Sequence, residues 1–359
     1  MIKTYKYYLI KTFSKSILTI SGVFFGLILI LNIFEEINYF KDLEISIFFP
    51  ILLNFLNAPS ILFNIFPFIF LISSQLFILK LIENNELIIF KNFGFDYLKL
   101  ISLFTLISFI FSLIIVLIFY NFSSKLKFTY LDLKSDYSSD DKYLAVITEN
   151  GLWIRDNTKD NINIINADSI MKDSLNNVTI TQFDSNYNLR KYIYSDLINI
   201  KNNIWEIKRG KISENNTLKN IDKTIYFKSN FNYNKINTLF SNLESLTLWQ
   251  LIELRKDYKT VGYSDNEINI HLQKLYSYPF YLTIMSMLAI VITLNFSSNK
   301  TKLFYIFVGI FLSAFVFYIN HFADLLAKNQ KLPVELSIWT PHLLMLIIVC
   351  IGLVRINEK

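Results

Sequence analysis

The sequence predicts an α-helical membrane protein with six transmembrane helices, three on each side of one inserted all-β domain. Six long apolar stretches contain no Lys, Arg, Asp or Glu, and a polar insert, residues 125–274, separates the third from the fourth. The mean hydropathy of +0.37 is typical of a membrane protein. The apolar stretches are Ser16–Phe34, Ile45–Leu79, Leu100–Ser124, Leu275–Asn299, Leu303–Ala323 and Leu336–Val354.

A helix crosses the hydrocarbon core of a bilayer, about 30 Å thick, with about 20 residues. Five of the stretches suit one crossing each, but Ile45–Leu79 is too long for one span and too short for two spans and a loop. Proline costs a helix interior about 3 kcal/mol. We therefore expect an interfacial segment, Ile45–Asn57, before a span near Ile61–Leu79, with breaks at Pro50, Pro59 and Pro67.

The distribution of basic residues predicts the orientation, because short cytoplasmic loops are enriched in Lys and Arg. One side holds Lys3, Lys6, Lys11, Lys15, Lys80, Lys91, Lys99, Lys300, Lys302, Arg355 and Lys359. The short loops of the other side hold only Lys41, Lys328 and Lys331. This bias puts both termini in the cytoplasm and the polar insert on the outer side.

Composition and motifs argue against several classes of function. The net charge of +6 is modest, so no nucleic-acid surface is implied. Cys350 is the only cysteine, which excludes an intrachain disulfide. No nucleotide-binding loop (GxxxxGK[ST] or GxGxxG), HExxH metal motif or GxSxG nucleophile motif is present. We therefore expect no catalytic residue, metal site or cofactor. The three histidines, His271, His321 and His342, are scattered along the chain and are not expected to form a metal site.

The insert reads as a β domain followed by a helical connector. Short alternating runs separated by Asn, Asp, Ser and Gly, as in 151–155, 178–183 and 203–208, predict an antiparallel sandwich or jelly roll. Which of its residues face inward is not visible in short irregular strands. After Leu243 the pattern predicts two short helices. The expected domains are 1–124 (helices one to three), 125–245 (β domain), 246–274 (connector) and 275–359 (helices four to six).

Two local features are candidates for function. Residues 81–94 can form a helix with Glu83 and Glu86 near its start, Leu87 and Phe90 among its apolar residues, and Gly94 as C-cap. Such a helix either lies on the bilayer or binds a cytoplasmic partner.

The second feature is Gly22 with Gly26, a pair of small residues four apart that allows close approach of another helix. Ordinary packing within the chain is the alternative explanation.

The whole chain resembles the LptF/LptG permeases of the lipopolysaccharide exporter. Residues 85–94 are similar to the family's S-E-[LI]…G coupling-helix motif, with Asn85 in place of Ser. Residues 151–153 resemble the G-L-W segment of the LptG jelly roll, which favours an LptG-like member. Further similarities are Lys274 and Pro279 at the start of span four, and Pro333, Trp339 and Pro341 around span six.

The resemblance implies a non-catalytic permease subunit in the bacterial inner membrane, with its jelly roll in the periplasm. Its implied partners are an LptF-like permease subunit, an LptB-like ATPase dimer that binds ATP, LptC-like and LptA-like bridge proteins, and lipopolysaccharide. Glu86 would contact the ATPase, with Glu83 and Leu87 assisting, and spans one and five would form lateral gates, giving Gly22 and Gly26 a role.

The sequence departs from LptG proteins at the outer end of span one, where only Lys41 is basic. Lys328 and Lys331 would supply further contacts to lipid head groups; alternatively, these three lysines are solvated loop charges. Two other functions remain open: a permease for a different lipid or a lipoprotein, and a membrane scaffold or receptor without transport activity.

Overall fold

The computed structural model describes residues 2–43, 45–92, 97–135, 137, 152–157, 161–171, 173–184, 187–214, 217–220, 223–233, 235–236, 242–261, 263–295 and 301–357. The chain forms two compact units, Met1–Lys127 with Asn269–Lys359, and Phe128–Ile268. We call them the transmembrane unit and the β unit.

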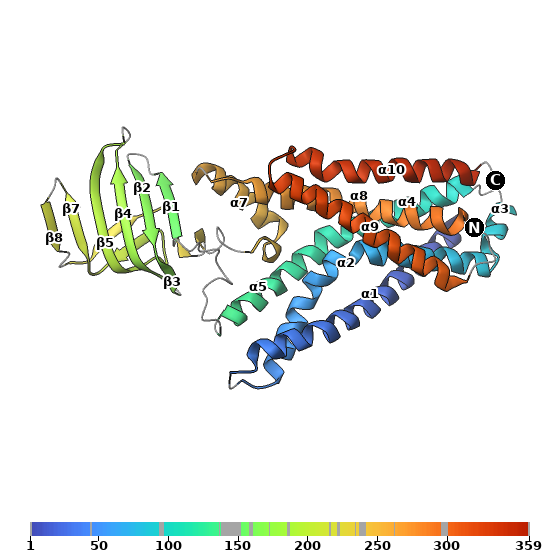
Figure 1. Cartoon of the computed structure of the whole chain (residues 1–359), viewed down its shortest axis with the longest axis horizontal. Helices are drawn as coiled ribbons and strands as arrows, with labels where there is room; N and C mark the ends of the chain where they lie inside the picture. Colours follow the sequence, from blue (N-terminus) through green and yellow to red (C-terminus); the bar gives the residue numbers. More distant parts are fainter. Residues whose placement is uncertain are drawn as a thin grey trace. The chain divides into compact units, whose positions relative to one another are not determined.

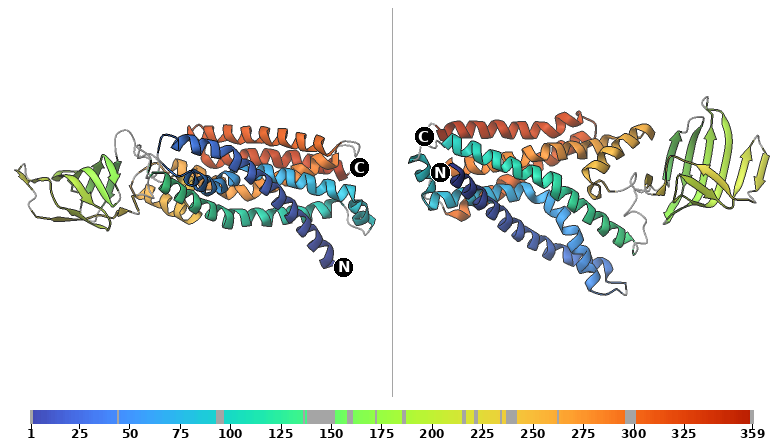
Figure 2. Two further views of the ribbon diagram at one scale, coloured as in Figure 1. Left: turned by 90° about the horizontal axis from the view of Figure 1, so that it is seen from below. Right: turned by 180° about the vertical axis from the view of Figure 1, so that it is seen from behind.

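Six helices of the described chain are long and apolar enough to cross a membrane, which confirms the predicted six-helix class. They are α1 (Ile2–Phe40), α2 (Phe48–Glu83), α4 (Tyr97–Ile114) continued through the π-helical η1 (Ile115–Tyr120) into α5 (Asn121–Ser135), α8 (Asn266–Asn295), α9 (Lys302–Lys328) and α10 (Val334–Asn357). The short α3 (Glu86–Asn92) joins α2 to α4 and lies at the end of this unit where α1 begins and α10 finishes (Figures 1 and 2).

The predicted break in the second apolar stretch is wrong, because α2 is one continuous helix of 36 residues. Pro50 lies in its first turn, where backbone N–H groups have no intrahelical acceptor in any case. Pro59 and Pro67 lie inside the helix and are buried. Prolines are tolerated in membrane helices where neighbouring helices cover the backbone groups they free. Here α2 packs along α1, and Asn54 donates a hydrogen bond to the Leu29 carbonyl at 2.8 Å.

The six helices are buried to very different extents. In the most apolar window of α2, 72% of the residues are buried inside the unit, and 67% in α8, but only 11% in α1 and 22% in α9. The main cluster of buried side chains joins α2, α8, α9 and α10 and is formed by Leu71, Ile284, Met285, Leu288, Ala289, Val316, Met345 and Val349. Thus α2 and α8 form the interior, whereas α1 and α9 present most of their apolar surface outward.

Gly309 of α9 packs directly against side chains of α2. A Cβ atom added there would meet Cδ2 of Leu71 at 2.7 Å and Cδ of Gln75 at 2.9 Å. Both side chains are fully buried, so they have little room to move. In contrast, nothing lies within 4 Å of the corresponding position at Gly22 or Gly26. Those two glycines therefore do not serve close helix packing within the described chain.

The β unit contains an antiparallel sheet, as predicted. Its described strands are β1 (Leu152–Asn157), β2 (Ile162–Ala167), β3 (Ser169–Met171), β4 (Ser174–Phe183), β5 (Leu189–Asn199), β6 (Ile204–Ile207), β7 (Lys211–Glu214), β8 (Thr217–Asn220) and β9 (Ile225–Lys228). The main order is β1-β2-β4-β5-β6-β9, with β3 on β4. The sheet branches at β5, because its first half pairs with β7 and its last residues pair with β6.

One face of this sheet is lined by a row of isoleucines. Pairing places Ile154, Ile165, Ile180 and Ile193 opposite one another on β1, β2, β4 and β5, and all four are buried. Their neighbours in sequence point to the other face, because side chains alternate along a strand. Trp205 of β6 is also fully buried, and its indole N–H donates to the Phe231 carbonyl at 2.8 Å.

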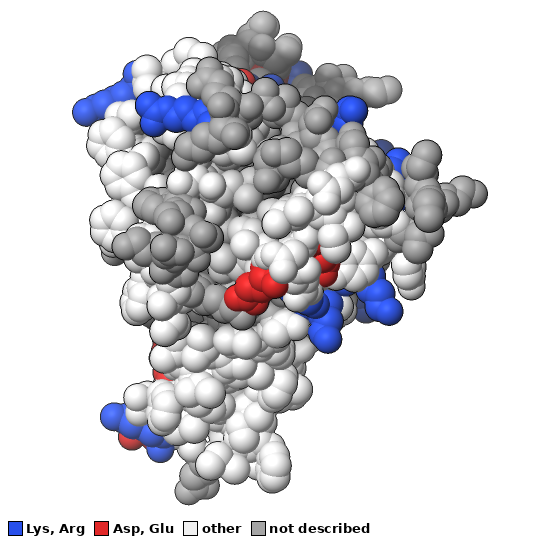
Figure 3. Space-filling model, turned by 90° about the vertical axis from the view of Figure 1, so that its right-hand side faces the viewer, with Lys and Arg blue, Asp and Glu red and all other residues white. Residues whose placement is uncertain are grey.

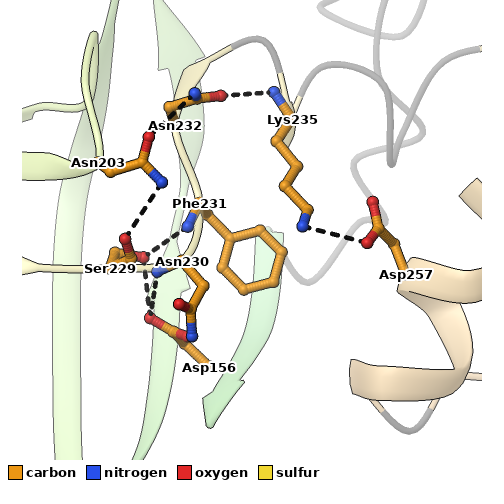
Figure 4. A network of polar contacts seen from close by, with 8 residues as sticks. All are labelled: Asp156, Asn203, Ser229, Asn230, Phe231, Asn232, Lys235 and Asp257. Atoms are coloured by element: carbon orange, nitrogen blue, oxygen red, sulfur yellow. Dashed lines mark hydrogen bonds and ion pairs between the residues drawn. The ribbon is translucent and has the colours of Figure 1, made fainter. Parts of the chain in front are cut away.

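A polar network fixes the segment after β9 (Figure 4). The buried carboxylate of Asp156 accepts hydrogen bonds from the Ser229 hydroxyl at 2.9 Å and from the backbone and side-chain amides of Asn230 at 3.2 and 2.8 Å. Further along the same segment, Lys235 forms an ion pair with Asp257 at 3.1 Å. The segment is thereby tied both to β1 and to the following helix, α7 (Leu248–Val261).

The residues after Leu243 are helical, with one difference from the predicted pair of short helices. The first is α7, but the second is the beginning of α8, which continues without a break into span four. At the junction, Arg255 donates to Asp265 at 3.0 Å, and Lys259 lies 3.5 Å from it. Burial acts to raise the pKa of Asp265, but the hydrogen bond from Arg255 and the charge of Lys259 outweigh it, so this pKa is lowered.

Replacing Trp205 tests the core of the β unit. We expect Trp205→Ala to destabilise this unit by about 3–5 kcal/mol, because it leaves a large cavity and an unpaired Phe231 carbonyl. Limited proteolysis of the purified chain in urea measures the effect. Trp249→Ala, at a position 72% exposed, is the control and is expected to change stability little. Equal protease resistance of the two variants would contradict this assignment of the core.

Replacing Gly309 tests the contact between α2 and α9. Gly309→Leu is expected to lower the thermal stability of the purified chain in detergent, because overfilling a packed interface costs about 1–3 kcal/mol. Gly26→Leu adds the same side chain where the chain leaves open space and is expected to leave the melting temperature nearly unchanged. A larger loss for the Gly26 variant would show that the wrong glycine has been assigned to packing.

Candidate functional site

The candidate docking helix starts later than the sequence predicted. Glu83 is the last residue of α2, and Asn84 follows as its C-cap. Asn85 then adopts a positive φ of 55°, a left-handed conformation that Asn tolerates better than most residues. This turn ends one helix and starts the next, so Glu83 and Asn85 lie outside α3, which begins at Glu86. Glu83 is exposed at the end of α2.

Glu86 is held by hydrogen bonds within the chain. Its Oε1 accepts one from the Tyr8 hydroxyl at 2.7 Å and one from Nδ2 of Asn84 at 2.8 Å. Its Oε2 is buried and has no hydrogen-bond partner in the described part of the chain. The carboxylate therefore joins α3 to α1 and to the end of α2.

The apolar residues of α3 divide between two faces. Leu87 is buried and borders a small hollow together with Leu9, Leu81 and Phe104. The Phe90 ring meets the Tyr5 ring edge-on, with centroids 6.2 Å apart. Ile88 and Ile89, in contrast, are 57% and 49% exposed.

Of the predicted contact residues in this segment, Leu87 thus faces the helices and Phe90 contacts α1. The exposed apolar surface belongs to Ile88 and Ile89, neither of which was among the predicted contact residues. A helical wheel could have suggested it, because Glu86, Leu87 and Phe90 fall on one side of a helix and Ile88 and Ile89 on another. Gly94, the predicted C-cap, lies outside the described residues.

The end of the transmembrane unit that carries α3 presents charged side chains of both signs. Figure 3 faces this end and shows Lys and Arg side chains mainly near the outline, with Asp and Glu side chains near the middle of the face among other described residues. Exposed cations on the helices that reach this end include Lys6, Lys80 and Lys99. A partner at this surface therefore meets the exposed Ile88 and Ile89 together with charges of both signs.

The lysines predicted to contact head groups lie in exposed positions. Lys41 follows α1, Lys328 is the last residue of α9, and Lys331 lies in the turn before α10. None of them forms an ion pair with another described residue. A cation that is paired is Lys274 of α8, whose Nζ lies 2.5 Å from Asp324 of α9. The sequence offered a weak signal for this pair, an acidic residue directly after an apolar stretch.

The histidines are separate from one another and take part in local contacts. His271 shares a hydrogen bond of 2.9 Å with the Tyr120 hydroxyl, and His342 one of 3.3 Å with Ser277. His321 stacks on Phe317. Among the residues that the structure describes, no three His, Cys, Asp or Glu side chains are grouped as a metal site would require.

Comparison with known proteins identifies the family. The family model for the lipopolysaccharide export system permease LptF/LptG matches residues 7–355, nearly the whole chain, without distinguishing LptF from LptG. No curated protein matches the sequence. The match covers all six membrane-spanning helices, the inserted sheet and α3, in the order that the family resemblance implied. This chain belongs to the LptF/LptG family of lipopolysaccharide export permeases.

Proposed function

We propose that this chain is the LptG-like permease subunit of an exporter that removes lipopolysaccharide from the bacterial inner membrane and passes it to a periplasmic bridge. The family match over residues 7–355 carries this proposal. The sequence has no nucleotide-binding loop, so ATP is hydrolysed by a separate LptB-like dimer in the cytoplasm. The remaining partners are an LptF-like permease and LptC-like and LptA-like bridge proteins.

The ATPase binds at α3. This helix offers exposed Ile88 and Ile89 at the end where α1 begins and α10 finishes, the cytoplasmic end according to the distribution of basic residues. Isoleucine side chains exposed to water gain free energy when a partner covers them. Glu86, Leu87 and Phe90 set the position of α3, and Glu83 lies beside it at the end of α2.

The LptF-like subunit covers α1 and α9. These are the least buried spans of the unit, and Gly22 and Gly26 leave open space on α1 that a second helix can enter. The two faces then form the lateral gates through which lipid passes. Lys41, Lys328 and Lys331 are exposed cations at the outer ends of these spans and suit the phosphates of a head group.

Lipid leaves the gates along the isoleucine row of the β unit. Ile154, Ile165, Ile180 and Ile193 form a buried apolar row without polar side chains in it. Acyl chains that enter this interior would be accepted without selection among them. Burying acyl chains yields about 0.8 kcal/mol per CH₂. Removing a lipid with several such chains from the bilayer therefore needs the energy of ATP hydrolysis.

A permease for a different lipid or a lipoprotein remains the second candidate. The reason is specific: the described outer end of α1 carries the exposed Lys41 but also the exposed Glu35, while Glu36 is buried, which suits a less phosphorylated cargo. Such a permease would share the helices and α3. A scaffold without transport activity would need no ATPase at α3.

Charge reversal at Glu86 tests binding of the ATPase. Glu86→Lys is expected to abolish co-purification of an ATPase, because the longer ammonium side chain does not fit beside the Tyr8 hydroxyl and therefore displaces α3. Tagged chain purified from membranes and probed for its ATPase gives the measurement. Glu253→Lys, the same change on exposed α7, is the control. Undiminished ATPase in the Glu86 variant would favour the scaffold.

Photocrosslinking tests the cargo and its path. A photoreactive amino acid at Ile180, on the isoleucine row, is expected to crosslink lipopolysaccharide in an ATP-dependent manner. The same amino acid at Thr179, the preceding residue of β4 on the opposite face, is the matched control. Adducts are detected by immunoblotting for lipopolysaccharide. Adducts with another lipid would identify the second candidate function, and no ATP-dependent adduct at Ile180 would contradict the proposed path.

A further inference from the structure

We propose that Tyr8 is a positioning residue that holds α3 against the start of α1, so that both helices move together when the ATPase moves α3. This inference rests on the proposed function and adds the contact through which a movement of α3 is passed on to α1. Its structural basis is the contact between the first turns of α1 and one face of α3.

Three neighbouring contacts form this junction. The Tyr5 ring meets the Phe90 ring, the Tyr8 hydroxyl donates to Glu86, and Leu9 borders the same hollow as Leu87. Residues 5, 8 and 9 fall on one face of α1, since residues three and four apart lie above one another on a helix. Residues 86, 87 and 90 do the same on α3. The two faces therefore meet over more than one turn.

The hydrogen bond between Tyr8 and Glu86 is the directional part of this junction. An O–H donor 2.7 Å from a carboxylate oxygen makes a charge-assisted bond, which is stronger than a bond between neutral groups. The other carboxylate oxygen is buried without a hydrogen-bond partner in the described chain. Glu86 therefore depends on Tyr8 and Asn84 for the stabilisation of its charge. The rings of Tyr5 and Phe90, in contrast, can slide.

The route continues along α1 because this helix is long and unbroken. It runs for 39 residues from Ile2 to Phe40 and contains no proline. It is also the least buried span, and its extensive contact within the chain is with one neighbour, α2. A displacement of α3 then reaches Gly22 and Gly26, on the part of α1 proposed to face the partner subunit.

This assignment changes the role of Glu86. If the carboxylate acted by a direct ion pair with the ATPase, its charge would be essential. If it acts by accepting the Tyr8 hydrogen bond, an amide oxygen can replace it. Glu86→Gln therefore separates the two roles: the junction requires that this variant keep its ATPase and most of its transport.

The decisive variant is Tyr8→Phe, which removes one oxygen and leaves the aromatic ring. The matched control is Tyr7→Phe, at a neighbouring tyrosine that is 67% exposed. Complete permease–ATPase complexes are purified and reconstituted in liposomes, and two quantities are measured: ATPase bound per permease, and lipopolysaccharide delivered to a periplasmic acceptor per ATP hydrolysed.

Tyr8→Phe is expected to bind the ATPase normally and to deliver about tenfold less lipopolysaccharide per ATP, the size of effect that one lost hydrogen bond to a charged group gives. Tyr7→Phe is expected to match the unaltered protein. Three results would overturn the inference: unchanged delivery in Tyr8→Phe, loss of bound ATPase in Tyr8→Phe, or a Glu86→Gln variant as defective as Glu86→Lys. An ATPase that stays bound to Glu86→Lys would instead contradict the proposed function.

Discussion

The transmembrane unit depends on one constraint: backbone N–H and C=O groups that enter hydrocarbon must already be hydrogen-bonded. Continuous helices satisfy it, which is why α2 spans 36 residues despite its prolines. Polar side chains within the spans meet the same demand locally. Thr105, Thr283 and Thr293 each donate to the carbonyl four residues earlier in their own helix. The edge strands of an open sheet would leave backbone N–H and C=O groups without partners in hydrocarbon. The polar strands therefore form a separate unit.

The fold class was readable from the sequence because it depends on composition over long windows. The assignment of six charge-free stretches and one polar insert does not change if a single residue is interpreted wrongly. The break in α2 was predicted wrongly because the cost of proline was taken from helices in water, where a free carbonyl is easily hydrated and the chain can turn away. In a bilayer the alternative to a continuous helix is an exposed backbone, so the helix continues through Pro59 and Pro67.

The candidate site was only partly readable, because its details depend on contacts distant in sequence. A short helix near residues 81–94 was predicted, yet its first residue is set by the left-handed Asn85, and its inner face by α1. Sequence alone offered Leu87, Ile88 and Phe90 as equivalent apolar residues. Only the positions of the neighbouring helices α1, α2, α4 and α8 make Leu87 internal and leave Ile88 exposed. Likewise, Gly22 was as good a candidate for close packing as Gly309 until the neighbours of each were known.

The carboxylate of Asp156 has a mechanical consequence. Asp156 lies in β1, and it accepts hydrogen bonds from Ser229 and Asn230, which are 73 and 74 positions later in the sequence. Both partners follow β9. The cluster therefore joins the first described strand of the sheet to the segment that follows the last one, and lies between the two chain connections of the β unit. A force that separates β1 from this segment would act on the three hydrogen bonds of Asp156 at the same time. Breaking several hydrogen bonds at once needs a larger force than breaking them one after another. If the proposed transport cycle pulls on the β unit through these connections, this cluster is the reinforcement at the point where the force enters.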